Sequence, residues 1–424
     1  MGGAHRQVSG MMAPTGNREA PVWAGPGMRE FVALMAALMA SNALAIDAML
    51  PALAAIGEDL GVGEENRRQL VISFYMIGFG AAQLVYGPLA DRLGRRMILI
   101  ISLGFYALFA VACGLAGDFG WLLAARALQG AAAAGTRTLV VSVVRDRFEG
   151  STMARVMSLV FIVFMIVPVL APAFGQAVLL VASWRFIFIG LGVYGLAVLA
   201  WALIRLPETL HPEYRRSLAP SAIWQAMVMT VRNRMSLGYT LASALVFGGF
   251  MGFLNSVQQI VTDVFGRPEL IALVFACVAG PLALTSWLNS RLVERFGARR
   301  LALVAGGLFL ALSATHLLVT LQFGAHIVPF TVLMALTMAC FGLIGANLGS
   351  LAMEEMGPIA GTAAAVQGMV GTIGAALIGL AIGQAFNDTV IPLVIGLTAA
   401  SALALLISWL TNRGSTYTPA AARA

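Results

Sequence analysis

The sequence predicts an all-α polytopic membrane protein, with twelve transmembrane helices in two pseudo-symmetric halves of six. Of its 424 residues, 60% are hydrophobic and 11% are charged, and the mean hydropathy is +0.89. Soluble globular chains do not show this balance. Apolar runs of about 20 residues, each enough to cross a hydrocarbon core of roughly 30 Å, follow one another along nearly the whole chain. Helices satisfy their own backbone in lipid, so each run is expected to be helical.

The two ends of the chain are expected to be tails rather than spans. Residues 1–30 are rich in Gly, Pro and Ala, carry Arg6 and Arg18, and lack the apolar core of a signal peptide. We therefore predict a disordered cytoplasmic N-terminal tail. Residues 412–424 have a similar composition and are predicted to form a cytoplasmic C-terminal tail.

Between the tails, the apolar runs fall into two sets separated by a long polar stretch. Residues 31–206 are predicted to form the N-terminal half, 207–235 a cytoplasmic central loop that acts as the hinge, and 236–411 the C-terminal half. The twelve expected spans are 31–54, 69–89, 97–117, 121–144, 155–180, 184–206, 236–260, 269–290, 301–321, 326–351, 360–384 and 389–411.

Arginine placement predicts the orientation. The formal charge is +7, yet the chain contains no lysine, and its arginines fall mostly in short gaps between runs, a pattern of topology and not of nucleic-acid binding. With both termini inside, the cytoplasmic gaps hold Arg92, Arg95, Arg96, Arg145, Arg147, Arg155, Arg205, Arg215, Arg216, Arg232, Arg234, Arg291, Arg295, Arg299 and Arg300, and the outer gaps hold Arg67, Arg68, Arg185 and Arg267. We expect a multi-pass protein of the bacterial inner (cell) membrane.

A glycine- and arginine-rich motif follows the second span and recurs, in weaker form, half a chain later. The first copy is Gly87-Pro-Leu-Ala-Asp-Arg-Leu-Gly-Arg-Arg96, and the second is Glu294-Arg-Phe-Gly-Ala-Arg299. Glycines permit a tight turn, and the charged residues can lock the cytoplasmic ends of two halves in one state and release them in another. The residues expected to form this cytoplasmic gate are Gly87, Asp91, Arg92, Gly94, Arg95 and Arg96.

This motif and four further segments resemble the major facilitator superfamily, in its bicyclomycin/chloramphenicol-type drug:proton antiporter branch. Arg126-Ala-Leu-Gln-Gly130 is similar to the R-x-x-Q-G pattern of proton-coupled exporters. Arg145-Asp-Arg-Phe148, Leu206-Pro-Glu-Thr-Leu210 and Asp47-Ala-Met-Leu-Pro51 resemble stretches of the same branch. The resemblance implies two halves that rock about a central cavity, and drug export by alternating access.

The fifth span departs from the antiporter pattern that the resemblance implies. Pro172 and Gly175 match the helix-five motif, but Gln176 replaces its second glycine. The fourth span carries a second arginine, Arg137, which the family pattern does not explain; it either extends toward lipid headgroups or has a role in the cavity.

Two ionisable residues deep in spans are the candidates for proton coupling. Asp47 is the single acid that we place deep in a span, and Arg126 is expected at a similar depth. Burial favours the neutral acid and a nearby arginine favours the carboxylate, so Asp47 is predicted to exchange a proton for substrate. The alternative is a static Asp47–Arg126 pair that fixes helix packing.

Amide side chains within the spans are candidates for lining the cavity, and helix–helix hydrogen bonds are the alternative role. They are Asn42, Gln129, Asn255, Gln258, Gln259 and Asn347. His316 and His326 lack a carboxylate at helical spacing, so packing is favoured over proton relay. Cys113, Cys277 and Cys340 show no metal-ligand spacing and are expected to be small core residues.

These features favour a secondary transporter that exports small amphipathic compounds, neutral or singly charged, in exchange for protons. We expect a monomer that needs no cofactor or metal, is driven by the proton gradient, and binds no nucleic acid. One alternative keeps the fold and imports a metabolite with protons. The other, a lipid-modifying membrane enzyme, would require paired acids or metal ligands at a membrane face, and the sequence presents none.

Overall fold

The structure, a computed structural model, describes residues 25–148, 150–210 and 220–413, and these form helices joined by short turns without any strand. The long helices are α1 (Met28–Asp47), continued by α2 (Leu53–Asp59), then α3 (Leu70–Leu93), α4 (Arg95–Gly114), α5 (Phe119–Arg147), α6 (Gly150–Leu179), α7 (Arg185–Arg205), α9 (Arg234–Gln259), α10 (Ile271–Phe296), α11 (Ala298–Phe323), α12 (Ile327–Met353), α13 (Ala360–Gln384) and α14 (Ile391–Asn412).

The predicted twelve spans are confirmed. Within the described residues, eleven helical segments are long and apolar enough to cross a membrane. The 30-residue α6, which contains Pro168 and Pro172, is the twelfth. Several helices, among them α3, α6 and α10, extend past the predicted limits by about one turn or more at one end, because a helix continues into the headgroup region after its apolar run has ended.

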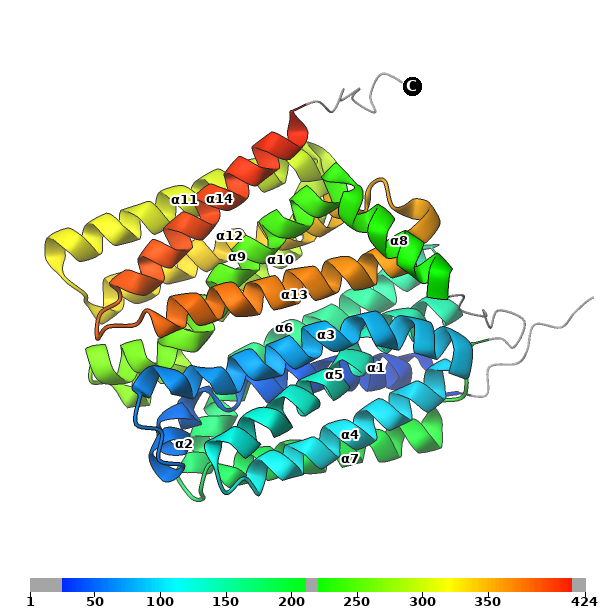
Figure 1. Cartoon of the computed structure of the whole chain (residues 1–424), viewed down its shortest axis with the longest axis horizontal. Helices are drawn as coiled ribbons and strands as arrows, with labels where there is room; N and C mark the ends of the chain where they lie inside the picture. Colours follow the sequence, from blue (N-terminus) through cyan, green and yellow to red (C-terminus); the bar gives the residue numbers. More distant parts are fainter. Residues whose placement is uncertain (1–24, 149, 211–219, 414–424) are drawn as a thin grey trace, which may run out of the picture.

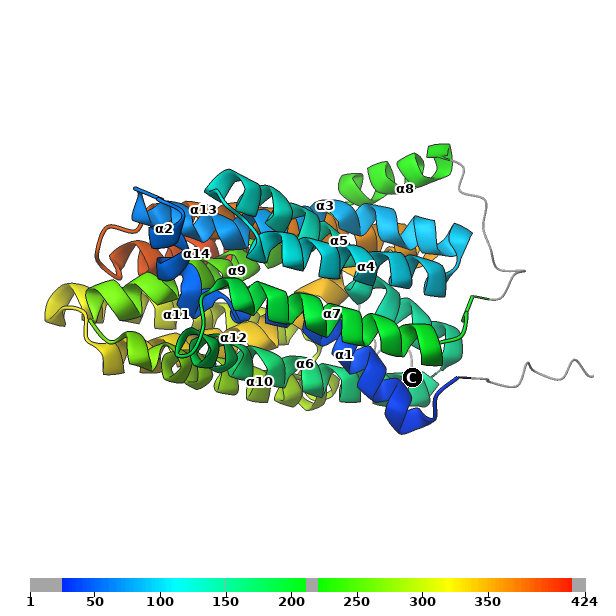
Figure 2. The ribbon, with the colours of Figure 1, turned by 90° about the horizontal axis from the view of Figure 1, so that it is seen from below.

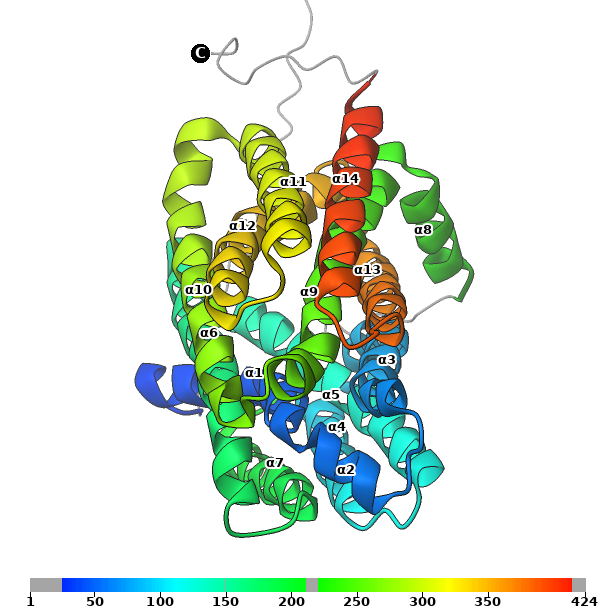
Figure 3. The ribbon, with the colours of Figure 1, turned by 90° about the vertical axis from the view of Figure 1, so that its left-hand side faces the viewer.

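The helices form two halves that lie one above the other in Figure 1, with α1–α7 below and α9–α14 above. The halves meet along α3 and α13, where the Gln83 side chain donates a hydrogen bond to the Thr372 hydroxyl at 3.0 Å. They meet again at α6 and α10, where Gln176 donates to the carbonyl of Pro268 at 3.0 Å. Figure 3 shows the same two halves along the helix axes.

The turns that join consecutive helices reveal the internal repeat. Gly94 joins α3 to α4 with φ +102°, and Gly297 joins α10 to α11 with φ +77°. L-residues with a side chain avoid this backbone region, so both turns require glycine. The two copies of the sequence motif therefore occupy equivalent positions in the two halves.

The bundle has two chemically different ends. We call the end that holds Gly94, Gly297 and the surrounding arginines the arginine end; it lies on the right in Figure 1. The opposite end, which holds α2 and the short helix η2 (Glu65–Gln69), we call the amide end. A helix not predicted from the sequence, α8 (Pro220–Arg232), lies in the central segment 207–235. Figures 1 and 2 place α8 outside the bundle at the arginine end, where it contacts α13 and α9.

The first span is longer than predicted and is interrupted. α1 ends at Asp47, a 3₁₀ turn follows at Leu50–Ala52, and α2 continues to Asp59. Pro51 has no backbone N–H to donate, so the α-helix does not run on through this point. Gly175 of α6 packs against the break so closely that a Cβ there would lie 1.8 Å from the Ala48 carbonyl oxygen. Asp47 therefore lies at a break held by the helix-five motif.

Candidate functional site

Arg126 is held in the interior of the N-terminal half by groups from two other helices. Its side chain is fully buried, and Nη2 donates to the Ala45 carbonyl of α1 at 3.1 Å. Nε donates to the Val71 carbonyl of α3 at 3.1 Å, and Nη1 donates to Gln129 Oε1 at 2.7 Å. The guanidinium also lies 4.4 Å from the centroid of the Tyr75 ring. Its charge is thus solvated by carbonyl dipoles and an aromatic face.

Asp47 lies two residues after the carbonyl that Arg126 contacts, and it is 5% exposed. Both side chains therefore lie at one depth, as the sequence predicted. Within the described residues, no ion pair links the Asp47 carboxyl to Arg126, and the carboxyl has no hydrogen-bond partner. The geometry of a static pair is not present, and Asp47 is a buried acid without a fixed countercharge.

The close approach of α3 and α5 positions this cluster. A Cβ on Gly130 would lie 1.9 Å from the Tyr75 carbonyl oxygen, so the glycine of the R-x-x-Q-G segment allows the two backbones to touch. Tyr75 then reaches α1, where its hydroxyl donates to Asn42 Oδ1 at 2.7 Å. Asn42 and Gln129, both predicted cavity residues, therefore belong to the Asp47–Arg126 cluster. Gln129 Nε2 is buried without a hydrogen-bond partner within the described chain.

The other predicted cavity residues are buried but lie in different places. Asn347 of α12 donates to Asn289 Oδ1 of α10 at 2.7 Å, a hydrogen bond between neighbouring helices. Gln258 donates to Thr262 on its own helix at 3.2 Å. Asn255 and Gln259 lie near the amide end, where the Cβ of Asn255 would be 3.0 Å from a Cβ on Gly383.

At the amide end, side-chain amides connect the two halves; we call Asn66, Gln69, Gln259 and Gln384 the amide clamp. Asn66 donates to the carbonyls of Gln384 and Phe386 at 3.2 and 2.9 Å, and accepts from Gln259 at 2.9 Å. Gln384 donates back to the Asn66 carbonyl at 2.6 Å. Gln69 donates to Gln259 and to the Gly383 carbonyl. These neutral bonds close the amide end between the halves.

Burial along α9 agrees with a closed amide end. Every residue from Met251 to Val261 is buried, so the last turns of this helix are enclosed on all sides. Between Met235 and Phe250, nearer the arginine end, buried and partly exposed residues alternate. The halves are packed together at the amide end and are more open toward the arginine end.

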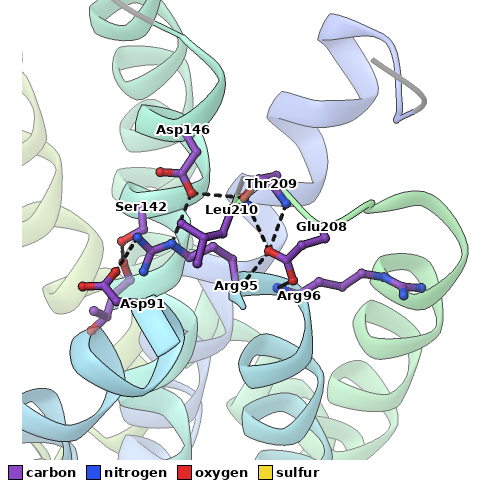
Figure 4. Close-up of polar contacts among 9 residues, drawn as sticks. Asp91, Arg95, Arg96, Ser142, Asp146, Glu208, Thr209 and Leu210 are labelled. Carbon is purple, nitrogen blue, oxygen red and sulfur yellow. Dashed lines mark hydrogen bonds and ion pairs between the residues drawn. The ribbon is translucent and has the colours of Figure 1, made fainter. Parts of the chain in front are cut away.

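Three of the predicted gate residues, Asp91, Arg95 and Arg96, belong to one network at the arginine end that joins three of the sequence motifs (Figure 4). Arg95 is 3% exposed; its Nη2 lies 2.6 Å from Asp91 Oδ1, and its Nε donates to Asp146 Oδ2 at 3.1 Å. Thr209 also donates to Asp146, at 3.2 Å. Arg92 is exposed, and a Cβ on Gly87 would meet no atom within 4 Å, so Gly87 is not required for helix approach.

Glu208 completes this network by capping the start of α4, as Figure 4 shows. Its carboxylate accepts backbone N–H groups from Arg95 at 2.8 Å and Arg96 at 3.2 Å, and from Thr209 and Leu210 at 3.0 Å each. The first N–H groups of a helix lack partners within it, and a negative charge there is favoured by the helix dipole. A Cβ on Gly94 would lie 2.4 Å from Glu208 Oε2, a second reason for glycine at this turn.

Sequence reasoning missed the amide clamp and the capping role of Glu208. The clamp pairs Asn66 with Gln384, which lie 318 residues apart, so no local pattern identifies it. The role of Glu208 could have been predicted from the sequence. Its carboxylate follows Pro207 at the cytoplasmic end of the predicted sixth span, and the predicted third span begins at the same side of the membrane, just after Gly94. In the second half, Arg299 lies 3.7 Å from Glu354 just after the end of α12, so an arginine of the weaker motif copy also pairs with an acid at the end of a neighbouring helix.

Of the histidines and cysteines, Cys113 alone contacts one of these clusters within the described residues: its thiol donates to Gln129 Oε1, the oxygen that also accepts from Arg126, with a sulfur–oxygen distance of 3.8 Å. His316 of α11 is buried with its ring 5.5 Å from that of Phe330, and His326 precedes α12 as an exposed residue. The three cysteines are free thiols; Cys113 and Cys340 are buried as predicted, but the prediction of a core position is wrong for Cys277, which is exposed on α10. Within the described chain, no group of three His, Cys, Asp or Glu side chains could hold a metal ion.

Two six-helix halves, closed against each other at one end and enclosing a buried acid and arginine, define a multi-pass membrane transporter. The sequence matches the profile of the Major Facilitator Superfamily over residues 35–379, and the chain belongs to this family.

Relatives and solved structures agree with this assignment. The chain is 29% identical to the uncharacterized MFS-type transporter YdgK of Bacillus subtilis, over 82% of this chain and 88% of that protein. It is 28% identical to the bicyclomycin resistance protein homolog of Haemophilus influenzae (87% and 92% covered) and to the multidrug resistance protein MdtL of Salmonella typhi (91% and 96% covered). Its fold is similar to a D-xylose-proton symporter, with TM-score 0.73 and 16% identity over 90% of this chain and 97% of that one.

Proposed function

We propose that this protein exports small amphipathic compounds, drug-like or antibiotic-like, across the cell membrane of a bacterium in exchange for protons. The observation that carries the proposal is Asp47, a buried acid without a fixed countercharge at the break of α1. A charged residue within a membrane is costly and is retained where it moves an ion or a ligand. The relatives named for bicyclomycin and multidrug resistance support drug-like substrates.

The arginine end faces the cytoplasm in this proposal. Arg95, Arg96, Arg145, Arg147 and Arg299 lie there, and the positive-inside rule places short arginine-rich loops on the cytoplasmic side. Both termini are then cytoplasmic. With this orientation, the amide clamp closes the side that faces the outside, and the less tightly packed arginine end faces the cytoplasm.

Each transport cycle uses Asp47 in two protonation states. Opening of the amide end lets Asp47 take a proton from outside, and the neutral acid then lowers the cost of closing the site to water. Opening toward the cytoplasm releases the proton and admits substrate. The halves 31–206 and 236–411 rock about the central segment 207–235, and the Asp91–Arg95–Asp146 network holds or releases the cytoplasmic end.

Inverted membrane vesicles acidified inside test this direction of transport. An exporter accumulates a radiolabelled antibiotic in such vesicles, whereas a proton-coupled importer of the same fold does not. Asp47→Asn is expected to abolish accumulation while counterflow exchange of the antibiotic persists, because the neutral amide mimics the protonated acid. Asp388→Asn makes the same chemical change in a loop at the amide end and serves as the control.

Growth tests identify which compounds the protein exports. The wild-type protein, expressed in an efflux-deficient bacterium, should raise the inhibitory concentrations of some antibiotics or dyes at least several-fold, and Asp47→Asn should not. Proton coupling that survives in Asp47→Asn vesicles would remove the proposed role of Asp47.

A further inference from the structure

The second arginine of α5 is placed very differently from the first. Arg137 follows Arg126 by eleven residues, about three helical turns, so both lie on one face of α5. Arg126 is fully buried with its donors engaged, whereas Arg137 is exposed. Within the described chain, Arg137 makes no hydrogen bond or ion pair; its guanidinium lies 5.9 Å from the centroid of the Phe79 ring. Among the described residues, this cation in the span therefore has an aromatic neighbour but no anionic partner.

The exposure of Arg137 is not exposure to lipid. Leu128, which is 49% exposed, marks the outer side of α5, and Arg137 follows it by nine residues, which is about half a turn around the helix. The residues on the face of α5 opposite Leu128 follow one another at helical spacing, and we call them the inner stripe. Along it, Gly130 and Ala134 are buried, while Arg137, Val141 and Arg145 are exposed. The change from buried to exposed along one stripe marks open space inside the bundle on the side of the arginine end.

The guanidinium of Arg137 points toward the middle of the bundle and away from the nearer headgroups. Gly135, two residues before Arg137, packs against Tyr86 of α3. Phe79, which the guanidinium covers, comes seven residues before Tyr86, about 10 Å closer to the amide end. Side chains on helices lean toward the helix N-terminus, and that of α5 lies at the amide end. An arginine that snorkels to the cytoplasmic surface would lean the other way.

We propose that Arg137 is the anchor for an anionic substrate: an amphipathic molecule with one carboxylate, whose charge pairs with the guanidinium and whose apolar body lies against Phe79. The guanidinium fork matches a carboxylate with two parallel hydrogen bonds. Asp47 and Arg126 together with Arg137 give a net charge of +1 when Asp47 is ionised and +2 when it is protonated. A monoanion brings this region closer to neutrality in both states, and a cationic drug does not.

This proposal rests on the proposed function and narrows its substrates to organic acids. Its test is equilibrium binding to the purified full-length protein, without any proton gradient. The probes are dansyl-phenylalanine, a carboxylate, and dansyl-phenylalaninamide, a neutral molecule of nearly the same shape. The wild type is expected to bind the carboxylate at least about tenfold more tightly, as a charge-assisted pair contributes in a partly dry site.

Substitutions at Arg137 then show whether this residue causes the preference for the carboxylate probe over the amide probe. Arg137→Gln should bind both probes about equally, at the affinity that the wild type shows for the amide, and this retained amide binding shows that the variant is folded. Arg137→Lys keeps the charge but not the fork, so an intermediate preference is expected. Arg145→Gln removes an exposed arginine further along the same stripe and should leave the preference unchanged.

Three results would overturn the proposal: equal affinity of the wild type for both probes, no binding of the carboxylate, or a carboxylate preference that persists in Arg137→Gln. A different experiment tests the proposed function. That function fails if transport in vesicles does not depend on the proton gradient or is unchanged by Asp47→Asn. A protein that binds carboxylates through Arg137 and yet does not export them would separate the two conclusions.

Discussion

Single residues at the arginine end show how the turn between α3 and α4 is stabilised. Glu208 gathers four backbone N–H groups, two of which belong to the first turn of α4. Gly94 leaves room for that carboxylate by having no Cβ. The sequence pattern therefore encodes one connected structure in which the end of the sixth span caps the start of the third.

Removal of the Glu208 carboxylate should lower stability measurably. We expect Glu208→Ala to reduce the free energy of unfolding by about 1–2 kcal/mol, because the N-terminal N–H groups of α4 lose their acceptor while water compensates in part. Glu208→Gln keeps one acceptor oxygen and should lose less. Thermal unfolding in detergent measures both; Glu269→Ala, at an exposed pair with Arg267, is the control. A melting temperature unchanged in Glu208→Ala would contradict the capping role.

Residue identities also explain how much of the site the sequence could provide. Asp47 and Arg126 were predictable, because charged residues within apolar runs are rare and functional. The interaction between these two residues was not predictable. Arg126 could be neutralised by Asp47 or solvated by the backbone carbonyls of Ala45 and Val71, and because every residue has a backbone carbonyl, the sequence does not distinguish the two arrangements. Only the packing of α1, α3 and α5 decides between the two.

At the scale of helices, close packing depends on small residues at a few contacts. In Gly175→Ala, the added methyl group would lie 1.8 Å from the Ala48 carbonyl oxygen. This distance is far too short for a non-bonded contact, so α6 and the break in α1 must separate. We expect a loss of about 1–3 kcal/mol in stability, as for other overpacked contacts. Because Asp47 adjoins this break, proton-coupled uptake in vesicles should fall at least tenfold.

Gly104→Ala provides the comparison for that substitution. Gly104 lies in α4, and a Cβ there would meet no atom within 4 Å. Alanine has the higher helix propensity, so this variant should be as stable as the wild type or slightly more stable. Equal stability of the Gly104→Ala and Gly175→Ala variants would show that the α1–α6 contact tolerates expansion.

Helix existence was predictable from sequence, whereas helix interruptions and surface helices were not. Twelve apolar runs gave the twelve spans, since the length of each run is set by bilayer thickness. The break after Asp47 depends on how α6 supports it through Gly175, which is a tertiary contact. Residues 207–235 are predicted from the sequence to be a loop, yet Pro220–Arg232 is helical where it packs on α13 and α9.

At the scale of the whole molecule, the amide clamp is the contact between the halves that must open in the proposed transport cycle. Neutral amide hydrogen bonds contribute about 0.5–1.5 kcal/mol each, and they do not depend on pH in the physiological range. We expect the double substitution Asn66→Ala with Gln384→Ala to favour the outward-open state by about 1–3 kcal/mol, a factor of roughly 5–150 in population. Distances between spin labels measure this shift.

The labels are placed on opposite halves at the amide end, at Gly63, where an added Cβ meets no atom within 4 Å, and at Asp388, after replacement of the three native cysteines by serine. A second, longer distance should appear in the double variant. Thr389→Ala removes two hydrogen bonds within one half, the one donated to Asn387 and the one accepted from the Ile391 N–H, and should leave the distances unchanged. An unaltered distance distribution in the double variant would show that the clamp does not hold the amide end closed.

Charge movement across the whole membrane follows from the proposed pairing of a monoanion with Arg137. With one proton carried inward on Asp47 and one negative charge carried outward, each cycle moves two charges. A potential of 100 mV, negative inside, contributes about 2.3 kcal/mol per charge, so it alone should sustain an anion gradient of roughly 2,000-fold. In proteoliposomes with a valinomycin-clamped potassium potential and equal pH, export of dansyl-phenylalanine should depend on potential twice as steeply as export of its neutral amide. Equal slopes for the two probes would mean that the carboxylate crosses in its neutral form, and export would then move a single charge.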